Sequence, residues 1–313
     1  MSGAETLMNR IVVAALLVTA TTLSARGFQG PPAGAPPGGL PPPPQQQGPK
    51  VVEAQKVKDN LCVLTGGGGN TTLFVTANNG AVVIDTKLPG WGQVLQDKIR
   101  SLTDKPVTTV INTHTHADHT SGNVEFPPTV NFVVQANTKV NMEKMDLFKG
   151  ESARYLPKTT FQDRLSLFSG ADRVDLYYFG LGGTNGDAWI VIPALRTLIA
   201  GDAFAAKAIT LIDKNNGGSA TGYLDTLQKL AATVAGVDTI ISGHDGVLAW
   251  NDLLQYIDLN REFQAWIRAE KQMGKTVDQA AMEYKLPEKY QGFNPPNPRG
   301  ITSYIQSVFD ETR

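Results

Sequence analysis

The sequence predicts an α+β protein in which two mixed β-sheets pack together and helices cover the outside. Two observations predict this class. Short β-rich runs alternate with segments of helical spacing, and this order occurs twice along the chain. The composition, 41% hydrophobic and 18% charged over 313 residues, is typical of a soluble globular protein that buries one large core or two smaller ones.

The first half of the folded region is expected to open with strands. Turn signals GGGGN and NNG separate three β-rich runs, and an amphipathic helix follows, with Val94, Leu95 and Ile99 on one face. The expected elements are strands at 60–66, 71–77 and 81–87, a helix at 91–102, strands at 107–112 and 131–136, and a helix at 137–148.

The second half repeats this order. Its expected elements are strands at 173–179, 187–193 and 196–202, a helix at 223–234, a strand at 238–243 and a helix at 251–268. The last of these helices should turn Leu254, Ile257, Phe263 and Ile267 inward as core residues. A C-terminal helix from about Ile301 should pack back on the domain.

The N-terminal region divides into two segments. Residues 1–26 are typical of a secretory signal peptide, because the apolar run 11–23 follows Arg10, precedes SARG and is too short to span a bilayer. We expect cleavage after Ala25, and a start at Met8 would fit such a signal better. Residues 27–49 carry 9 of the 19 prolines and no charge, which indicates an extended linker.

The folded domain is therefore expected at 50–313, in an exported protein without stable membrane insertion after cleavage. The net charge of −1 gives no reason to bind nucleic acid or an anionic membrane, so we expect a small-molecule substrate. Cys62 is the only cysteine and should pack as a small buried residue without a disulfide. The GGGGN run lacks the Lys and Ser/Thr of a phosphate-binding loop and is interpreted as a flexible hairpin tip.

Three of the four histidines lie in the short run THTHADH. His114 and His116 are two residues apart directly after a strand, so both imidazoles point the same way and can share one metal ion. Asp118 and His119 point elsewhere and offer an oxygen and a nitrogen to a second ion. Imidazole with carboxylate suits zinc first, with iron or manganese as alternatives.

THTHADHTSGN resembles the His-x-His-x-Asp-His signature of the metallo-β-lactamase fold superfamily, and the resemblance extends over about 200 residues in order. It implies a four-layer αββα sandwich. It also implies a supporting role for Asp85 in VVIDTK, a bridging carboxylate at Asp202 in LIAGDAF, and a last metal ligand at His244 in IISGHDG.

The chain departs from the family pattern at one ligand position. Where the family has Gly-His-Thr-x-Gly-Asp, the chain has GGTNGD, with Gly183 in place of the histidine. Glycine cannot ligate through a side chain, so the site of His114 and His116 loses a nitrogen. The resemblance then implies one complete zinc site, of Asp118, His119 and His244 with Asp202, and a weaker second one, unless Tyr177, Tyr178 or Asn185 replaces the histidine.

The expected activity is hydrolysis of an ester, thioester, amide or lactam by a metal-bound hydroxide, with Asp118 orienting or deprotonating the water. Asp202 favours hydrolases of the glyoxalase II kind, while the exported location keeps a β-lactam substrate open. His116 argues against the iron-dependent oxygen-reducing relatives, which carry glutamate there, and the neutral charge argues against the nucleases. A metal-binding envelope protein with little or no catalysis is the alternative, because of Gly183. The oligomeric state stays open.

Overall fold

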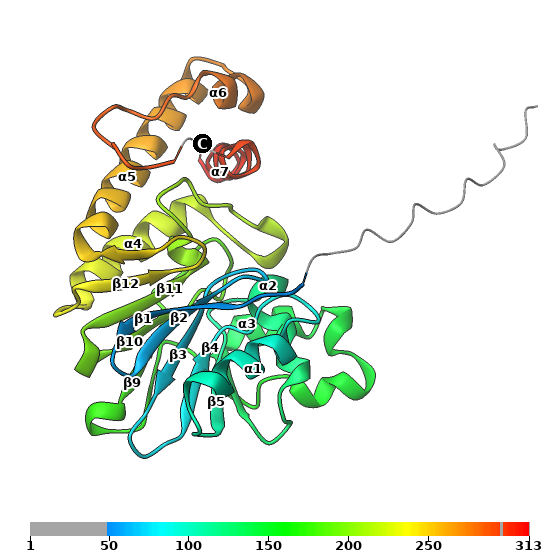
Figure 1. Ribbon diagram of the computed structural model, residues 1–313. Helices are drawn as coiled ribbons and strands as arrows, with labels where there is room; N and C mark the ends of the chain where they lie inside the picture. Colours follow the sequence, from blue (N-terminus) through cyan, green and yellow to red (C-terminus); the bar gives the residue numbers. More distant parts are fainter. Residues whose placement is uncertain (1–48, 295–296, 313) are drawn as a thin grey trace, which may run out of the picture. The chain divides into compact units, whose positions relative to one another are not determined.

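The structure is a computed structural model that describes residues 49–294 and 297–312 (Figure 1). Its first sheet has seven strands among these residues, antiparallel from β1 to β4 and parallel from β4 to β7. In spatial order they are β1 (Glu53–Lys58), β2 (Leu61–Thr65), β3 (Thr71–Val75), β4 (Ala81–Ile84), β5 (Val107–Ile111), β6 (Asn131–Gln135) and β7 (Thr159–Phe161).

The second sheet has six strands in the described part of the chain. Only its β11–β12 pair is parallel, and the other pairs are antiparallel. In spatial order they are β13 (Val247–Ala249), β12 (Thr239–Ser242), β11 (Thr197–Gly201), β10 (Trp189–Ile192), β9 (Val174–Tyr177) and β8 (Arg164–Leu167).

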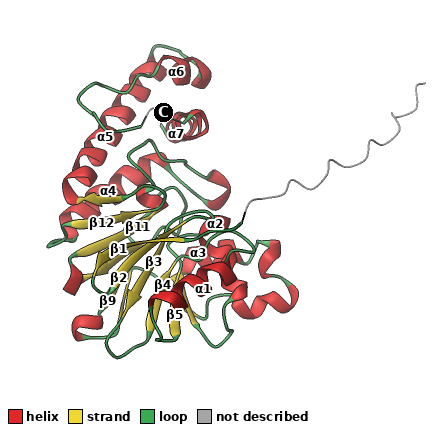
Figure 2. Cartoon of the chain, viewed as in Figure 1, coloured by secondary structure: helices red, strands yellow, loops and turns green. Residues whose placement is uncertain are grey.

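Helices lie outside the two sheets (Figure 2). They are α1 (Gly92–Leu102), α2 (Ala117–Thr120), α3 (Ala136–Met142), α4 (Ala220–Thr233), α5 (Trp250–Gln272), α6 (Val277–Glu283) and α7 (Pro298–Glu311). Short 3-10 turns occur at Ser121–Glu125, Asp146–Phe148, Gly150–Tyr155, Gly170–Asp172, Pro193–Leu195, Asp202–Phe204 and Lys214–Asn216.

Alternation along the strands divides the apolar residues into separate layers. In β3, Leu73 faces the helix side with Leu95 and Ile99 of α1, whereas Phe74 faces the space between the sheets. The middle layer joins residues of both sheets, such as Phe74 and Ile190, and a third cluster joins the second sheet to α4, α5 and α7. The predicted four-layer αββα sandwich is confirmed.

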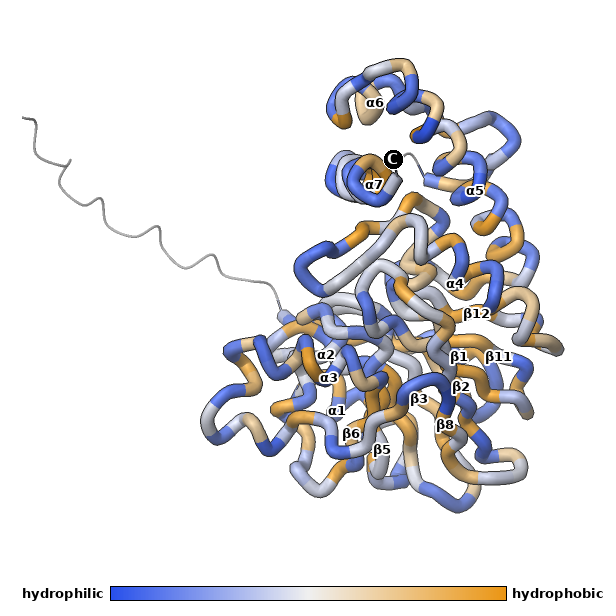
Figure 3. The backbone as a smooth tube through the Cα atoms, turned by 180° about the vertical axis from the view of Figure 1, so that it is seen from behind, coloured by the Kyte–Doolittle hydropathy of each residue, from blue (hydrophilic) through white to orange (hydrophobic). Residues whose placement is uncertain are grey.

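The helix termini follow local capping signals. The side chain of Ser219 accepts a hydrogen bond from the Gly222 amide at the start of α4, and Asn297 caps α7 directly before Pro298. Polar and apolar segments alternate along α5, α6 and α7 (Figure 3), as expected for helices with one buried face. The C-terminal helix begins at Pro298 rather than Ile301, and its buried Tyr304 packs on the domain as predicted.

Two sequence predictions about helices are wrong in detail. The helix expected at 137–148 ends at Met142, because Met142 and Phe148 both enter the same core and would lie about 120° apart around a continuous helix. In α5, Leu254 is not turned inward but is 41% exposed, because the buried face of the helix carries Leu253 and Ile257.

Cys62 is half-buried rather than buried, because its strand β2 turns Leu61 and Val63, not Cys62, into the layer between the sheets. The predicted signal peptide lies outside the described residues, as does the linker apart from Pro49. Among the described helices, none combines the length and the apolar character that crossing a bilayer requires.

Candidate metal centre

The two sheets bring the predicted ligands to one place. In the first sheet β4 and β5 are parallel and Ile84 pairs with Ile111, so Asp85 and the segment 112–119 leave the sheet at the same edge. In the second sheet β11 and β12 are parallel, and Asp202 and His244 follow their ends. Parallel strands end at a common edge, and this edge therefore collects side chains from four separate loops.

The first site consists of His114, His116 and Asp202. Nε2 of His114 lies 3.0 Å from Nδ1 of His116. Oδ2 of Asp202 lies 3.6 Å from the first of these nitrogens and 3.9 Å from the second. Two imidazoles and one carboxylate thus face a common point.

The second site consists of Asp118, His119 and His244, with the other oxygen of Asp202 beside it. Nε2 of His119 and Nε2 of His244 are 3.3 Å apart, and each lies 3.2 Å from Oδ1 of Asp202. Oδ2 of Asp118 lies 3.3 Å from the His244 nitrogen and 3.7 Å from the His119 nitrogen. Asp202 therefore reaches both sites, one oxygen to each.

These donors fit a metal ion. Ligands about 2.0 to 2.2 Å from a tetrahedral zinc ion lie roughly 3.3 to 3.6 Å from one another, close to the separations in both sites. Oδ1 of Asp202 is buried and has no hydrogen-bond partner among the described residues, although two histidine nitrogens face it. An ion bound between these atoms would satisfy that oxygen.

Asp85 lies behind both sites. Its Oδ2 lies 2.7 Å from Nδ1 of His119 and accepts a hydrogen bond from the Thr113 hydroxyl at 2.7 Å. That hydroxyl lies 2.9 Å from Nδ1 of His114. In the neutral rings we assign the proton to Nδ1 of both histidines, which leaves each Nε2 lone pair facing a site.

Attraction to nearby carboxylates favours the protonated form of two of the histidines, His116 and His119. Burial favours the neutral ring, but Asp202 and Asp213 outweigh it and raise the pKa of His116 to about 9. For His119, Asp202 and Asp85 likewise outweigh burial and raise the pKa well above its usual value. Metal binding therefore has to displace protons from these rings.

The tetraglycine loop, Gly66–Gly69 between β2 and β3, lies against the second site. A Cβ built on Gly69 would overlap Nε2 of His119, so only glycine fits at this position without a shift. The buried ammonium of Lys87 holds the loop by donating to the carbonyls of Leu64 and Gly69, both at 2.6 Å. The sequence predicts a hairpin tip here, and in the structure the same loop also forms one wall of the centre.

Gly183 has no side chain and so adds no ligand atom to the first site. A Cβ built there lies 3.0 Å from the carbonyl oxygen of Leu211. Two of the three suggested replacements have other contacts: Asn185 accepts a hydrogen bond from the Asn141 side chain, and the Tyr177 ring stacks on Phe179.

A residue that sequence reasoning missed contacts the first site from outside. Oδ2 of Asp213 lies 3.0 Å from Nε2 of His116. The residues are 97 positions apart, and no local pattern around Asp213 signals the contact.

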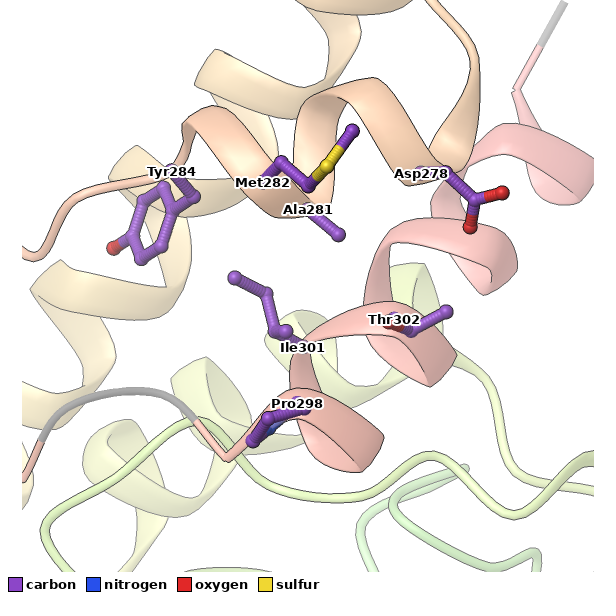
Figure 4. A pocket seen from close by; sticks show the side chains of 7 residues that line it. All are labelled: Asp278, Ala281, Met282, Tyr284, Pro298, Ile301 and Thr302. Carbon is purple, nitrogen blue, oxygen red and sulfur yellow. The ribbon is translucent and has the colours of Figure 1, made fainter. Parts of the chain in front are cut away.

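A cavity of about 640 Å³ between α6 and α7 is separate from this centre (Figure 4). It has a single carboxylate, Asp278, and no histidine among its lining residues, which are Asp278, Ala281, Met282, Tyr284, Pro298, Ile301 and Thr302. The cavity therefore offers no comparable set of metal ligands.

Two packed mixed sheets with clustered histidines and aspartates at one edge define an αββα protein with two side-chain groups that could hold a metal ion. The model of the metallo-beta-lactamase superfamily matches residues 64–244, and the chain belongs to this superfamily. A metallo-beta-lactamase type 2 from Elizabethkingia meningoseptica is 24% identical over 231 residues, which cover 68% of this chain and 86% of that protein.

Solved structures show the same fold. The inverting sec-alkylsulfatase Pisa1 from Pseudomonas sp. superposes with a TM-score of 0.67 at 15% identity, over 83% of this chain, which spans half of that enzyme's length. A metallo-beta-lactamase from Pontibacter korlensis gives a TM-score of 0.58 at 19% identity, over 67% of this chain and 99% of that one. Membership supports a hydrolase in general and leaves the substrate open.

Proposed function

We propose that the chain is an exported zinc-dependent hydrolase that cleaves an ester, thioester, amide or lactam bond. The observation that carries this proposal is the pair of ligand groups joined by Asp202, one oxygen of which faces each group. A bound zinc ion lowers the pKa of water to about 7 and polarises a carbonyl oxygen. Iron or manganese would suit the same ligands less well.

The exposed fractions of the ligands indicate the side from which substrate approaches. His114 and His119 are buried, whereas the side chains of His116, Asp118 and His244 are 22%, 27% and 38% exposed. Asp118 thus lies on the open side next to both histidines of the second site. We assign to its carboxylate the orientation of the attacking water and acceptance of its proton.

The second site should hold metal more tightly. It has Asp118, His119, His244 and one oxygen of Asp202, while the first site has two histidines and the other Asp202 oxygen. The expected stoichiometry is therefore one tightly bound zinc ion and one weakly bound ion. A β-lactam is the alternative substrate, supported by the Elizabethkingia relative, and export rests on the predicted signal peptide alone.

The test is to purify the full chain without chelator, count zinc, iron and manganese by elemental mass spectrometry, and assay a model ester, thioester and lactam. We expect about one zinc per chain and hydrolysis that is lost in His119→Ala. The matched control is Lys214→Ala, whose side chain pairs with Asp310 on the surface. Metal without hydrolysis would favour the non-catalytic metal-binding protein instead.

Gly183→His tests the missing ligand. Because the variant supplies a third nitrogen, it should raise the zinc content toward two per chain, provided that the Leu211 carbonyl gives way by a few tenths of an ångström. Equilibrium dialysis against zinc measures this. Unchanged metal content and unchanged hydrolysis would show that the absent histidine does not limit the first site.

A further inference from the structure

Asp213 is held rigidly by its own loop. Its Oδ1 accepts hydrogen bonds from the backbone amides of Asn215 and Asn216, and its Oδ2 accepts one from the side-chain amide of Asn216 at 2.7 Å. These three hydrogen bonds orient the Asp213 carboxylate independently of its contact with His116.

The loop is anchored at the position of the missing histidine and at the C-terminal helix. The backbone amide of Asp213 donates to the carbonyl of Gly183 at 2.8 Å. The amide of Ile212, next to it, donates to the hydroxyl of Ser303 in α7 at 3.1 Å. These two hydrogen bonds hold the segment that places the Asp213 side chain beside the first site.

The contact sets which nitrogen of His116 can bind metal. A carboxylate only accepts hydrogen bonds, so the Nε2 that faces Asp213 at 3.0 Å must carry the proton of the neutral ring. The lone pair is then on Nδ1, the atom that faces His114 at 3.0 Å and Asp202 at 3.9 Å. The opposite tautomer would direct an N–H group into the first site.

We propose that Asp213 is a positioning residue that holds His116 in its metal-binding tautomer and so keeps the first site able to bind metal without a ligand at position 183. The inference rests on the proposed metal centre. The first site has two histidines and one carboxylate, one ligand fewer than it would have with a histidine at position 183. Its metal affinity therefore depends more strongly on a partner that holds His116 in place.

The experiment is a zinc titration of the full chain in competition with a metal-binding dye. Asp213→Ala should weaken the first site about 10-fold to 100-fold and leave the second site within about 3-fold. Asp213→Asn keeps one acceptor oxygen, so its first-site zinc affinity should lie between those of the wild type and Asp213→Ala. Lys214→Ala is the matched control in the same loop, and cobalt absorption spectra of each variant report the ligands of the weaker site. Equal affinity of the weaker site in wild type and Asp213→Ala would overturn the proposal.

A second measurement reads the tautomer without any metal. Long-range ¹H–¹⁵N spectra of the four histidines, at alkaline pH where the rings are neutral, should show the proton of His116 on Nε2 in the wild type and a mixture in Asp213→Ala. A proton on Nδ1 in the wild type would overturn the proposal even if Asp213→Ala fails to fold. Absence of zinc binding in the wild type would instead refute the proposed function, and the spectra separate these two failures.

The proposal also predicts non-additivity. If Asp213 makes up for the missing histidine, Asp213→Ala should cost less first-site affinity in a Gly183→His background than in the wild type. Equal losses in both backgrounds would show that the two positions act independently and would contradict the compensating role.

Discussion

At the scale of single residues, two very close contacts in the centre are made by residues without a side chain. Gly69 passes so close to His119 that any Cβ there would overlap Nε2, the nitrogen facing the second site. Gly243 stands in the same relation to Oδ1 of Asp202. Neither glycine has a positive φ, so the backbone conformation does not require glycine at these positions; the close contacts do.

We expect Gly69→Ala to displace either His119 or the tetraglycine loop. The zinc affinity of the second site should fall roughly 10-fold or more, and the free energy of unfolding should fall by about 1 to 3 kcal/mol from overpacking. Dye competition and chemical denaturation measure the two effects. Gly246→Ala is the matched control, since a Cβ built there meets nothing within 4 Å. Equal zinc affinity in both variants would mean that the loop moves without disturbing His119.

The clustered histidines and aspartates were predictable because family motifs carry them in three short segments, each at the end of a strand. Asp213 was not predictable, because its role depends on a loop that folds back over 97 residues to reach His116. The need for glycine at position 69 was equally hidden, because a run of glycines in a sequence can indicate either a flexible loop or a close approach of the backbone.

At the scale of elements, one carboxylate joins the turn between β3 and β4 to the second sheet. Asp172, which precedes β9, accepts hydrogen bonds from the amides of Ala77 and Asn78 and from the side chain of Asn79, at 2.6, 2.8 and 2.8 Å. Burial disfavours the charged form, but these three donors outweigh it and lower the pKa of Asp172. The turn is therefore stabilised only while the carboxylate is ionised.

Asp172→Ala should lower the free energy of unfolding by about 2 kcal/mol at neutral pH. Because the folded-state pKa lies below the unfolded value of about 3.9, the contribution is complete above that pH and is lost as the pH falls through the folded-state pKa. Urea denaturation over a pH series should show the two proteins converging below about pH 4. The control is Asp146→Ala, an exposed pair with Lys149. A difference that does not depend on pH would refute the role of the charge.

Which elements could be predicted depends on how much of their pattern is apolar. Strands β2 to β6 and β9 to β12 were recognised from buried runs such as AVVI in β4. The edge strands β1, β7, β8 and β13 and helix α6 were missed, because they are short or, as in EAQKVK of β1, mostly exposed. Such elements form because a neighbouring strand or helix is already in place, which no local pattern records.

At the scale of the whole molecule, the metal centre joins the two sheets. His114, His116, Asp118 and His119 follow β5 of the first sheet, whereas Asp202 and His244 follow β11 and β12 of the second. Protein contacts also join the two sheets at this edge: the side chain of Asn70 donates to the carbonyls of Ser242 and Asp245. An ion held by residues of both sheets therefore binds only when both are folded and packed.

Removal of the metal should consequently destabilise the entire domain and not only the loops around the site. With free zinc at about 1,000 times its dissociation constant, binding adds about 4 kcal/mol to the free energy of unfolding, which corresponds to a rise of roughly 7 °C in Tm for a domain of this size. Scanning calorimetry of the full chain with zinc and with a chelator measures the shift, and re-addition of zinc should restore it. His119→Ala should show a smaller shift than the wild type, because its second site lacks a central ligand and only the weaker first site remains. A wild-type Tm that does not respond to the chelator would show that the two sheets hold together without an ion between them.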